Sequence, residues 1–369
     1  MSENILNCVD AVLRVDSNVF IHNWEKVKVD IAALQLELNE AAGFQVNVGS
    51  GKDLQVFLFE GLKLTPLKVS IKTQRVKFDA SVLKAYKHPL VGKVIELRHL
   101  LSIERSFRGV SPFIVGDRLS YSFHRGSTGL VYTKEPNVNS FPAELREAII
   151  PDEGCLFVCI QYPYLELYVA AQFVGETGIV RKFNLGVDIF AELSEGFMEE
   201  EEAEEVVGAY LRGYSETELA FKFQKDVNVI NALVYRFLSL YSSFAGWQGI
   251  IKAIDVAGEV EAQGGKVYQV VREGEIDPQE ELRKAVNFKL QASTAFILNE
   301  AVTGWGSTEG LKFKLPLFDG FLIQMPSLPI EDLPGWLTAM KVQMQGNAVS
   351  SGAPVSFGVG STWQEARVK

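Results

Sequence analysis

The first residues of chemical interest lie at the end of an apolar run, "CLFVCIQYPYLELYVAAQFVG", at positions 155–175. This run predicts a buried strand that leads directly into a helix. A strand that ends on a polar residue is a common way to present that residue to a cleft, and here the residue is Gln161. Glu166 follows on the predicted helix. Metal binding and proton transfer at such a place usually require a carboxylate, so an amide there raises the question of what the protein does without one.

Three cysteines, Cys8, Cys155 and Cys159, are too few for a disulfide framework. Cys155 and Cys159 lie four positions apart on the predicted strand and therefore share a face. A metal or redox pair would need a C-x-x-C spacing or a histidine-rich partner segment, and neither is present. Buried free thiols in a reducing compartment are the favoured interpretation.

The chain has 369 residues, of which 47% are hydrophobic and 22% charged. These values are typical of a folded protein with two or three coupled subdomains. No apolar run approaches the roughly 20 residues that span a bilayer. The first residues also lack the basic and apolar regions of a signal peptide. The sequence therefore predicts a cytoplasmic protein with no membrane partner.

The net charge of −10 hides a contrast between two segments. Residues 51–110 hold 12 Lys and Arg against 5 Asp and Glu, a local charge of +7, whereas residues 183–211 hold nine Asp and Glu and no basic residue. A polyanion would be attracted to the first segment and repelled by the second. Solvated helix faces are the alternative interpretation of both.

Helical and strand-like segments alternate in blocks along the chain. Helical spacing is found at 24–42, 51–62, 81–107, 188–250, 279–303 and 333–345, and the segment 81–107 is expected to form two helices with a break near Pro89. Strand-like segments are found at 118–134 and 155–161, in two hairpins at 258–271 and 311–325, and at 354–360. Gly264-Gly265 and Asp319-Gly320 are expected in the hairpin turns, and Gly43 is expected to end the first helix. The order predicts an α+β fold in which two helical lobes rise from a sheet.

Seven segments resemble, in the right order, those of family A DNA polymerases, the bacterial polymerase I class. "TGLVYTKEPNVNSFP" at 128–142 resembles TGRLSS-x-x-PNLQNIP, "QYPYLELY" at 161–168 resembles motif A, DYSQIELR, and "LFDGFLIQM" at 317–325 resembles motif C, VHDELVFEV. Four further segments have counterparts in the family: "FQVNVGSGKDLQVFLFEGLKL", "FNLGVDIFAELSEGF", "RKAVNFKLQASTAFIL" and "PVSFGVGSTWQEA". Together they extend from about residue 20 to the C-terminus.

The resemblance implies a right-hand polymerase fold, with an antiparallel-sheet palm, a helical thumb and helical fingers, and no exonuclease domain. The implied divisions are N-terminal palm-associated helices at 1–40, the thumb at 41–110, the palm at 111–190 and 286–369, and degenerate fingers at 191–285.

The family holds two Mg²⁺ ions with one aspartate from motif A and one from motif C. The motif A position here is Gln161, and the motif C position is Asp319. The neighbours of Asp319, which are His and Glu in the family, are Phe318 and Gly320. Because an amide carries no net charge, the resemblance implies that Asp319 alone remains as a weak or absent metal site. Asp319 also has a structural explanation, since Asp-Gly is a preferred hairpin turn.

The resemblance also implies that the residues that bind the triphosphate in the family have been replaced. The Arg and Lys of the family's fingers helix correspond to Glu200 and Glu204, and the aromatic residue and tyrosine that follow them correspond to Gly208 and Arg212. Phosphate recognition depends on positive charge and N–H donors, and glutamates offer neither.

Two further family contacts are also replaced. The histidine that touches phosphate corresponds to Phe190, and the Arg of TGRLSS, which contacts the primer terminus, corresponds to Leu130.

Other positions match family residues that touch DNA. Arg283, Asn287 and Gln291 lie at i, i+4 and i+8 on one helix face, although an ordinary polar helix face is the alternative interpretation. Glu166 matches the steric-gate glutamate of motif A. The remaining predicted DNA contacts are Thr128, Asn137, Lys72, Arg75 and Lys77.

The first hypothesis is therefore a catalytically degenerate, phage-like polymerase homologue, a primer-template-binding or structural accessory subunit in DNA replication or repair. It would need no cofactor, and its partners would be DNA and replication proteins such as an active polymerase, helicase or primase. The second hypothesis is a divergent but active DNA-directed DNA polymerase that uses Mg²⁺. The third is a protein–protein interaction module without nucleic-acid binding, whose acidic run docks a partner or mimics DNA.

Overall fold

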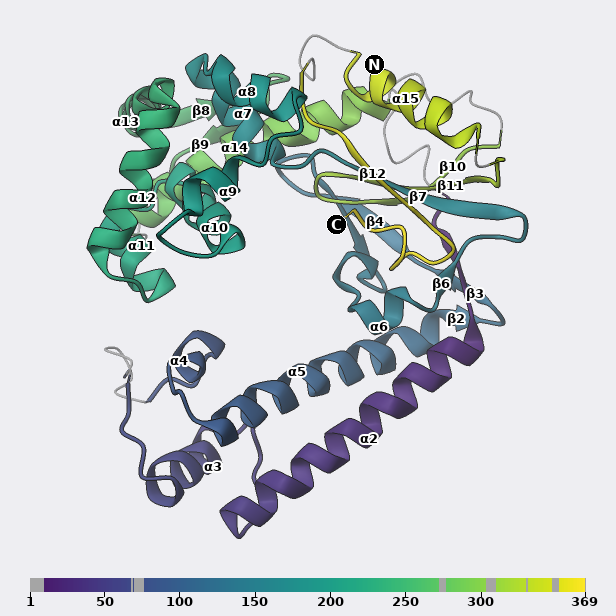
Figure 1. The fold of residues 1–369 in the computed structure, drawn as a ribbon, viewed down its shortest axis with the longest axis vertical. Coiled ribbons are helices and arrows are strands. Elements are labelled where there is room, and N and C mark those ends of the chain that lie inside the picture. The colour runs from purple at the N-terminus through teal and green to yellow at the C-terminus, as the bar shows by residue number, and fades with distance from the viewer. Residues whose placement is uncertain are drawn as a thin grey trace.

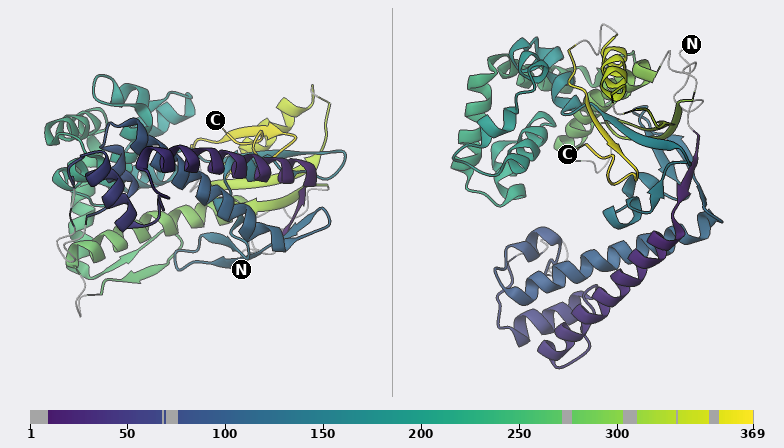
Figure 2. Two further views of the ribbon diagram at one scale, coloured as in Figure 1. Left: turned by 90° about the horizontal axis from the view of Figure 1, so that it is seen from below. Right: turned by 45° about the vertical axis from the view of Figure 1, so that its right-hand side comes forward.

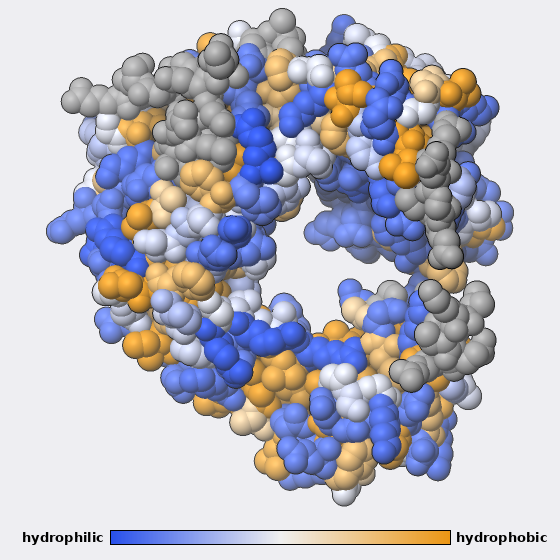
Figure 3. Space-filling model, turned by 180° about the vertical axis from the view of Figure 1, so that it is seen from behind, coloured by the Kyte–Doolittle hydropathy of each residue, from blue (hydrophilic) through white to orange (hydrophobic). Residues whose placement is uncertain are grey.

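The computed structural model describes residues 10–67, 69, 76–271, 277–302, 310–329, 331–346 and 352–368. A sheet platform carries two helical lobes that face each other across an opening (Figure 1). The opening persists when all atoms are drawn (Figure 3). This arrangement confirms the predicted α+β fold with two helical lobes.

The first lobe, called here the α2–α5 lobe, is built on two long helices that lie side by side. Helix α2 (Ser17–Ala42) begins after Asp16, whose carboxylate accepts the N–H groups of Asn18 and Val19. It ends at Gly43, which adopts a left-handed φ of 74° and confirms the predicted stop. Helix α5 (Pro89–Val110) runs beside it, and Figure 2 shows α2 on the outer side of the lobe.

Three short helical segments complete the tip of this lobe: α3 (Gly51–Gln55), the π-helical turn η1 (Val56–Gly61) and α4 (Ala80–Lys84). The guanidinium of Arg98 on α5 donates to the carbonyls of Val48 and Phe78, at 2.7 and 2.5 Å. These bonds tie the loops on either side of α3 and η1 to α5.

A small antiparallel sheet joins the α2–α5 lobe to the platform. Its strand order is β2 (Ile114–Val115), β3 (Arg118–Ser120), β1 (Val12–Val15) and β6 (Ile149–Ile150). The hairpin β4 (Ser122–Arg125) and β5 (Val131–Lys134), the 3₁₀ turns η2 (Ser111–Phe113) and η3 (Val138–Ser140), and α6 (Ala143–Arg146) lie nearby.

The platform is a four-stranded antiparallel sheet in the order β10 (Lys312–Pro316), β11 (Gly320–Pro326), β7 (Cys155–Gln161) and β12 (Ser356–Gly360). Alternation along β7 sends Val158 and Ile160 into one apolar core and Phe157 and Cys159 into another. Three helices cover the first face: α7 (Leu165–Val174), α14 (Pro278–Val302) and α15 (Leu333–Met344).

The second lobe, called the α8–α13 lobe, follows α7. Its helices are α8 (Thr177–Asn184), α9 (Ile189–Ser194), α10 (Glu200–Leu211), α11 (Glu216–Phe223), α12 (Val227–Leu240), the 3₁₀ segment η4 (Ser242–Gly246) and α13 (Trp247–Ala257). Trp247 is fully buried, and its indole N–H donates to the carbonyl of Leu211 at 2.8 Å. The hairpin β8 (Glu259–Glu261) and β9 (Val267–Gln269) then turns at Gly264 and Gly265, which both have positive φ and confirm the predicted turn.

One local prediction was wrong. Gly320 does not sit in the hairpin turn with Asp319 but is the first residue of β11, opposite Gln161. The loop consists of residues 317–319, and the N–H of Leu317 bonds the carbonyl of Gly320 at 2.9 Å. Glycine is required here by close strand packing, because a Cβ at this position would lie 1.9 Å from the carbonyl oxygen of Ile160.

Some predicted features lie outside the described residues, namely Cys8, Lys72 and Arg75. Cys155 and Cys159 are free thiols, as favoured above, and burial raises the pKa of Cys159 to about 12. Within the described ranges, no helix has both the length and the apolar character needed to cross a bilayer.

Candidate functional site

The end of β7 and the loop before β11 bring the two predicted metal-site positions together. The side-chain amide of Gln161 donates to Oδ1 of Asp319 at 3.0 Å. The main chains are joined as well, since the N–H of Tyr162 donates to the carbonyl of Asp319 at 2.8 Å. The amide nitrogen faces the carboxylate because two facing oxygens would repel each other. Asp319 thus already has a partner on the side where a second carboxylate would share a metal ion.

Asp319 is partly buried at this junction. Burial raises the pKa of its carboxyl, while the hydrogen bond from Gln161 and the charge of Arg367 oppose that shift. A neutral amide stabilises an adjacent carboxylate less than a metal ion does, so the desolvation effect prevails.

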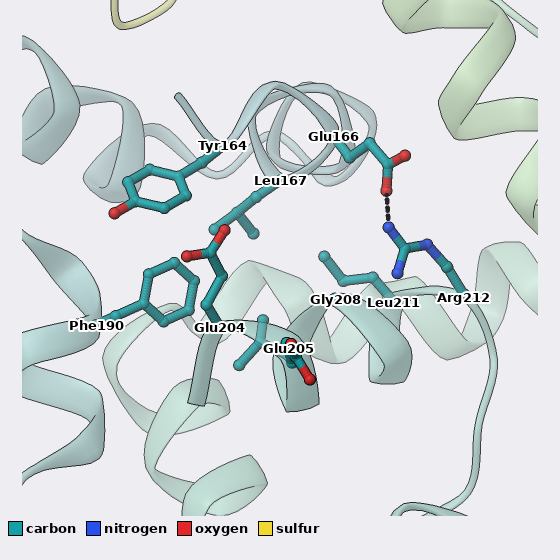
Figure 4. A pocket seen from close by; sticks show the side chains of 10 residues that line it. Tyr164, Glu166, Leu167, Phe190, Glu204, Glu205, Gly208, Leu211 and Arg212 are labelled. Carbon is teal, nitrogen blue, oxygen red and sulfur yellow. Dashed lines mark hydrogen bonds and ion pairs between the residues drawn. The ribbon is translucent and has the colours of Figure 1, made fainter. Parts of the chain in front are cut away.

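A pocket of about 200 Å³ lies between α7, which follows β7, and the helices α9 and α10 (Figure 4). Its aromatic side is formed by Tyr164 and Phe190, whose ring centroids are 5.1 Å apart. Its polar side carries Glu166, Glu204, Glu205 and Arg212. Three carboxylates and one guanidinium make this lining predominantly acidic.

The single cation in the lining is already paired. Arg212 follows the last residue of α10 and donates to Glu166 at 2.5 Å (Figure 4). Both side chains are 30–40% exposed, with 39% for Arg212 and 30% for Glu166, so the pair is only partly shielded from water. It connects the end of α10 to α7 across one side of the pocket. The predicted steric-gate residue is therefore held by an ion pair.

Glu204 projects toward the aromatic side, between Phe190 and Leu167 (Figure 4). Its pKa is raised by burial and further by the negative charges of Asp188 and Glu205. Burial together with nearby acids, Asp188 first, also raises the pKa of Tyr164 to about 12. In both cases the nearby acids add to the effect of burial and raise the pKa, as expected where the local electrostatic potential is negative.

The three predicted DNA contacts on α14 do lie on one half-exposed face, but they are not equivalent. Arg283 donates to Glu218 at 2.8 Å and lies 4.8 Å from the ring centroid of Tyr214. Asn287 and Gln291 have no side-chain hydrogen-bond partner among the described residues. Two amides on this face are therefore available to a ligand, and the arginine is not.

The other predicted contacts differ in accessibility. Thr128 and Leu130 are buried in the turn between β4 and β5, and the Thr128 hydroxyl lies 3.5 Å from the N–H of Leu130. Asn137 is exposed, with its side-chain oxygen accepting from Thr133. Lys77 is exposed near α4.

Two cations near the site were not singled out as site residues from the sequence. Arg212 pairs with a residue 46 positions away. Lys266, at the tip of the β8–β9 hairpin, donates to the carbonyl of Ser127 at 3.1 Å and lies against Gly129. No local sequence pattern signals either contact, since both depend on tertiary packing. In the part of the chain that the structure describes, no group of three or more His, Cys, Asp or Glu is placed to hold a metal ion.

Comparisons with known proteins agree on one family. The model of DNA polymerase family A matches residues 18–365. The thermostable DNA polymerase I of Thermus aquaticus is 30% identical over 180 residues, which cover 45% of this chain and 22% of that protein. DNA polymerase I of Lactococcus lactis subsp. cremoris is 25% identical over 373 residues, covering 91% of this chain and 42% of the relative. The chain spans less than half the length of these curated relatives.

Among solved structures, the polymerase domain of Pol1 from M. smegmatis, in complex with DNA primer-template and dNTP, has a TM-score of 0.82. The match is 18% identical in sequence and covers 96% of this chain and 68% of that one, which establishes the shared fold. The fold and the family model, which matches nearly the whole chain, lead to the same conclusion. The chain belongs to DNA polymerase family A.

Proposed function

We propose that this chain binds DNA primer-template without transferring nucleotides to it, and acts as an accessory subunit in DNA replication or repair. The observation that carries the proposal is the hydrogen bond from Gln161 to Asp319. It places an amide N–H, rather than a second carboxylate, where the family shares its metal ions.

The chemistry of the donor set supports loss of the metal site. Mg²⁺ is bound by oxygen ligands, usually one or two carboxylates together with substrate phosphates. Asp319 supplies one carboxylate, while Gln161 directs a donor at it. Gly320 cannot be exchanged for an acid without a backbone shift, because its Cβ would meet the Ile160 carbonyl. These residues do not fit a pair of Mg²⁺ ions.

The pocket beside α10 supports loss of triphosphate binding. A triphosphate needs cations and N–H donors, but the lining offers Glu204 and Glu205, and its Arg212 is engaged by Glu166. Carboxylates outnumber cations in this lining, so an approaching polyanion meets repulsion.

Retention of DNA binding is supported by the opposite lobe. Lys77, Lys84 and Lys87 are exposed near α4 and form no ion pair with another described residue. Across the opening, Asn287 and Gln291 present unpartnered amides. The structural neighbour holds a primer-template in its complex. Within this proposal the thumb is 41–110, the degenerate fingers are 191–285, and the palm comprises 111–190 and 286–369 with residues 1–40 attached.

Primer extension tests the catalytic part. With a labelled primer-template, four dNTPs and either Mg²⁺ or Mn²⁺, the protein should extend no primer, because one carboxylate cannot align primer hydroxyl and triphosphate. Template-directed extension that disappears in Asp319→Ala would overturn the proposal in favour of a divergent active polymerase. The Asp319→Ala protein thereby also controls for a contaminating polymerase.

DNA binding is tested separately by fluorescence anisotropy on the same primer-template. Binding should be detectable at low salt and weaken steeply as salt rises, since phosphate contacts release counterions. Replacing Lys77, Lys84 and Lys87 by Gln should reduce the salt slope by about two to three. Lys252→Gln, on the exposed face of α13, is the control and should leave it unchanged. No binding at low salt would favour a protein–protein module instead.

The accessory role is tested by affinity capture from host extract treated with nuclease. An active polymerase, a helicase or a primase should be recovered with the chain. Capture of none of these with intact DNA binding would restrict the proposal to a DNA-binding protein outside a replication assembly.

A further inference from the structure

Among the described residues, the platform sheet ends on a strand with no further partner strand. Strand β12 is last in the order β10–β11–β7–β12 and pairs only with β7, from Ser356 opposite Gln161 to Gly360 opposite Phe157. None of its other backbone groups is bonded to any described residue. Exposed strand edges are usually blocked by charge, proline or a covering segment, because they pair readily with other chains.

Here the edge forms the floor of a groove of about 790 Å³. On one face of the sheet, Phe357 and Val359 pack toward α15, whose residues Leu337 and Lys341 form one wall. On the other face, the final residues of the chain fold back so closely that a Cβ on Gly358 would lie 2.2 Å from the Ala366 carbonyl oxygen.

These final residues supply Arg367 and Val368 as the second wall. Figure 1 shows β12 running between α15 and the C-terminal end. Helix α15 and the C-terminal residues therefore extend beyond β12, one on each face of the sheet.

A groove of this shape can accommodate an additional strand. It would lie about 4.8 Å from β12 in the plane of the sheet, satisfy the free backbone groups, and point alternate side chains at α15 and at the C-terminal residues. Leu337 and Val368 offer apolar contacts on the two walls.

The charged side chains on the two walls of the groove indicate which kind of partner would bind there. Lys341 and Arg367 are exposed, one on each wall, and neither forms an ion pair with another described residue. The acidic residue of the groove, Glu365, is turned to Ser361, which donates both its N–H and its hydroxyl. A second copy paired across a two-fold axis would bring the same cations together and repel. We infer that this groove binds an extended segment of a partner protein that carries both apolar and acidic side chains on each of its two faces, adding it as a fifth strand beside β12.

The test uses a fluorescently labelled hexapeptide, Val-Val-Glu-Glu-Val-Val, which has a glutamate on each face of an extended strand, with Val-Val-Lys-Lys-Val-Val as its control. The first should bind the full chain in an anisotropy titration and the second should not. The double variant Lys341→Glu, Arg367→Glu should bind the glutamate peptide at least about tenfold more weakly and should now accept the lysine peptide. Lys252→Glu, an equal charge change on α13, should behave as wild type. These side chains are exposed, so the variants should fold.

Hydrogen exchange distinguishes strand addition from ionic attraction alone. Bound peptide should slow exchange in Ser356–Gly360 of the wild-type chain, because amides facing the groove gain acceptors. Absence of binding at millimolar peptide, or binding without this protection, would overturn the inference. Protection that increases with chain concentration alone would instead assign the groove to a second copy. No DNA is present, so the outcome is independent of the proposed function.

Discussion

At the scale of single residues, the pair Gln161 and Asp319 joins the end of β7 to the loop before β11 at the place where the proposed function puts a lost metal site. The side-chain amide of Gln161 donates to the carboxylate of Asp319 at 3.0 Å. The pairing of β7 with β11 continues in register to Gln161 opposite Gly320. The backbone on both sides of the hydrogen bond is therefore held by regular strand pairing.

Asp319→Asn should make the protein more stable at neutral pH. The carboxyl pKa is raised above its usual 3.8 by burial, so the folded chain keeps a proton over a pH range where the unfolded chain has lost it. Stability therefore falls as pH rises through that range, and the loss is complete above the raised pKa. Urea unfolding from pH 4 to 7.5 should show a gain for the variant at the upper end that vanishes at the lower end. Asp332→Asn, at the exposed start of α15, is the matched control for the loss of a surface carboxylate.

Gln161→Asp should lower the melting temperature at neutral pH in the absence of divalent cations. It would place two carboxylates close together at a partly buried position, where like charges disfavour ionisation. Adding Mg²⁺ should recover part of the loss, because bound metal stabilises the folded state. Gln161→Asn keeps a neutral amide and should show no response to Mg²⁺ by thermal denaturation. An equal response in both variants would contradict this explanation.

At the scale of elements, local sequence signals sufficed for most of the fold but not for the site. Gly43 as a helix stop, Pro89 at the start of α5 and Gly264-Gly265 in a hairpin were predictable because each depends on backbone conformation within a few residues. The ion pairs Arg212–Glu166 and Arg283–Glu218 join residues 46 and 65 positions apart. Only the packing of α10 on α7 and of α11 near α14 brings them together.

Asp319-Gly320 shows why a correct local rule can fail. The dipeptide satisfies the requirements of a tight turn, and also those of a strand that must approach its neighbour closely. The sequence is the same in both cases. The pairing of β11 with β7 decides that Gly320 lies in the strand rather than in the turn. This pairing joins residues far apart in the sequence, so a local pattern cannot reveal it.

Gly320→Ala should destabilise the fold by about 3 kcal/mol or more, because the new methyl group would contact the Ile160 carbonyl and separate β11 from β7. The matched control is Gly92→Ala in the exposed interior of α5, where a Cβ meets nothing within 4 Å. That variant should instead gain about 0.5–1 kcal/mol through helix propensity. Urea denaturation of both variants measures the difference, and a mild effect of Gly320→Ala would contradict the close approach.

At the scale of the whole molecule, opposite charges are carried by the two lobes. The segment that includes α3 to α5 is basic and that around α10 is acidic, and they face each other across the opening (Figure 1). DNA placed there would be attracted by one side and repelled by the other. The proposed binding should therefore be weaker and more dependent on one lobe than binding to two basic surfaces.

Neutralising α10 should strengthen DNA binding. Replacing Glu200, Glu201, Glu204 and Glu205 by Gln removes four negative charges from the acidic side, and we expect about tenfold tighter binding at low salt. The gain should shrink as salt rises because exposed charges are screened. Glu25→Gln with Glu40→Gln, on the exposed surface of α2, is the control and should have a smaller effect. Unchanged affinity of the α10 variant in anisotropy titrations would place bound DNA away from that helix.

Helix α2 belongs to two hydrophobic cores at once. Phe20 and Val27 are buried with Phe107 beside the small sheet, whereas Leu38 is buried with Val94 and Leu97 at the far end. A helix of 26 residues is about 39 Å long, so a tilt of about 10° at the seated end would carry the tip through about 7 Å. Three aromatic rings, Phe20, Trp24 and Phe107, pack together at the seated end of α2. A substitution that repacks these rings would therefore be expected to move the far end of the lobe and change the width of the opening.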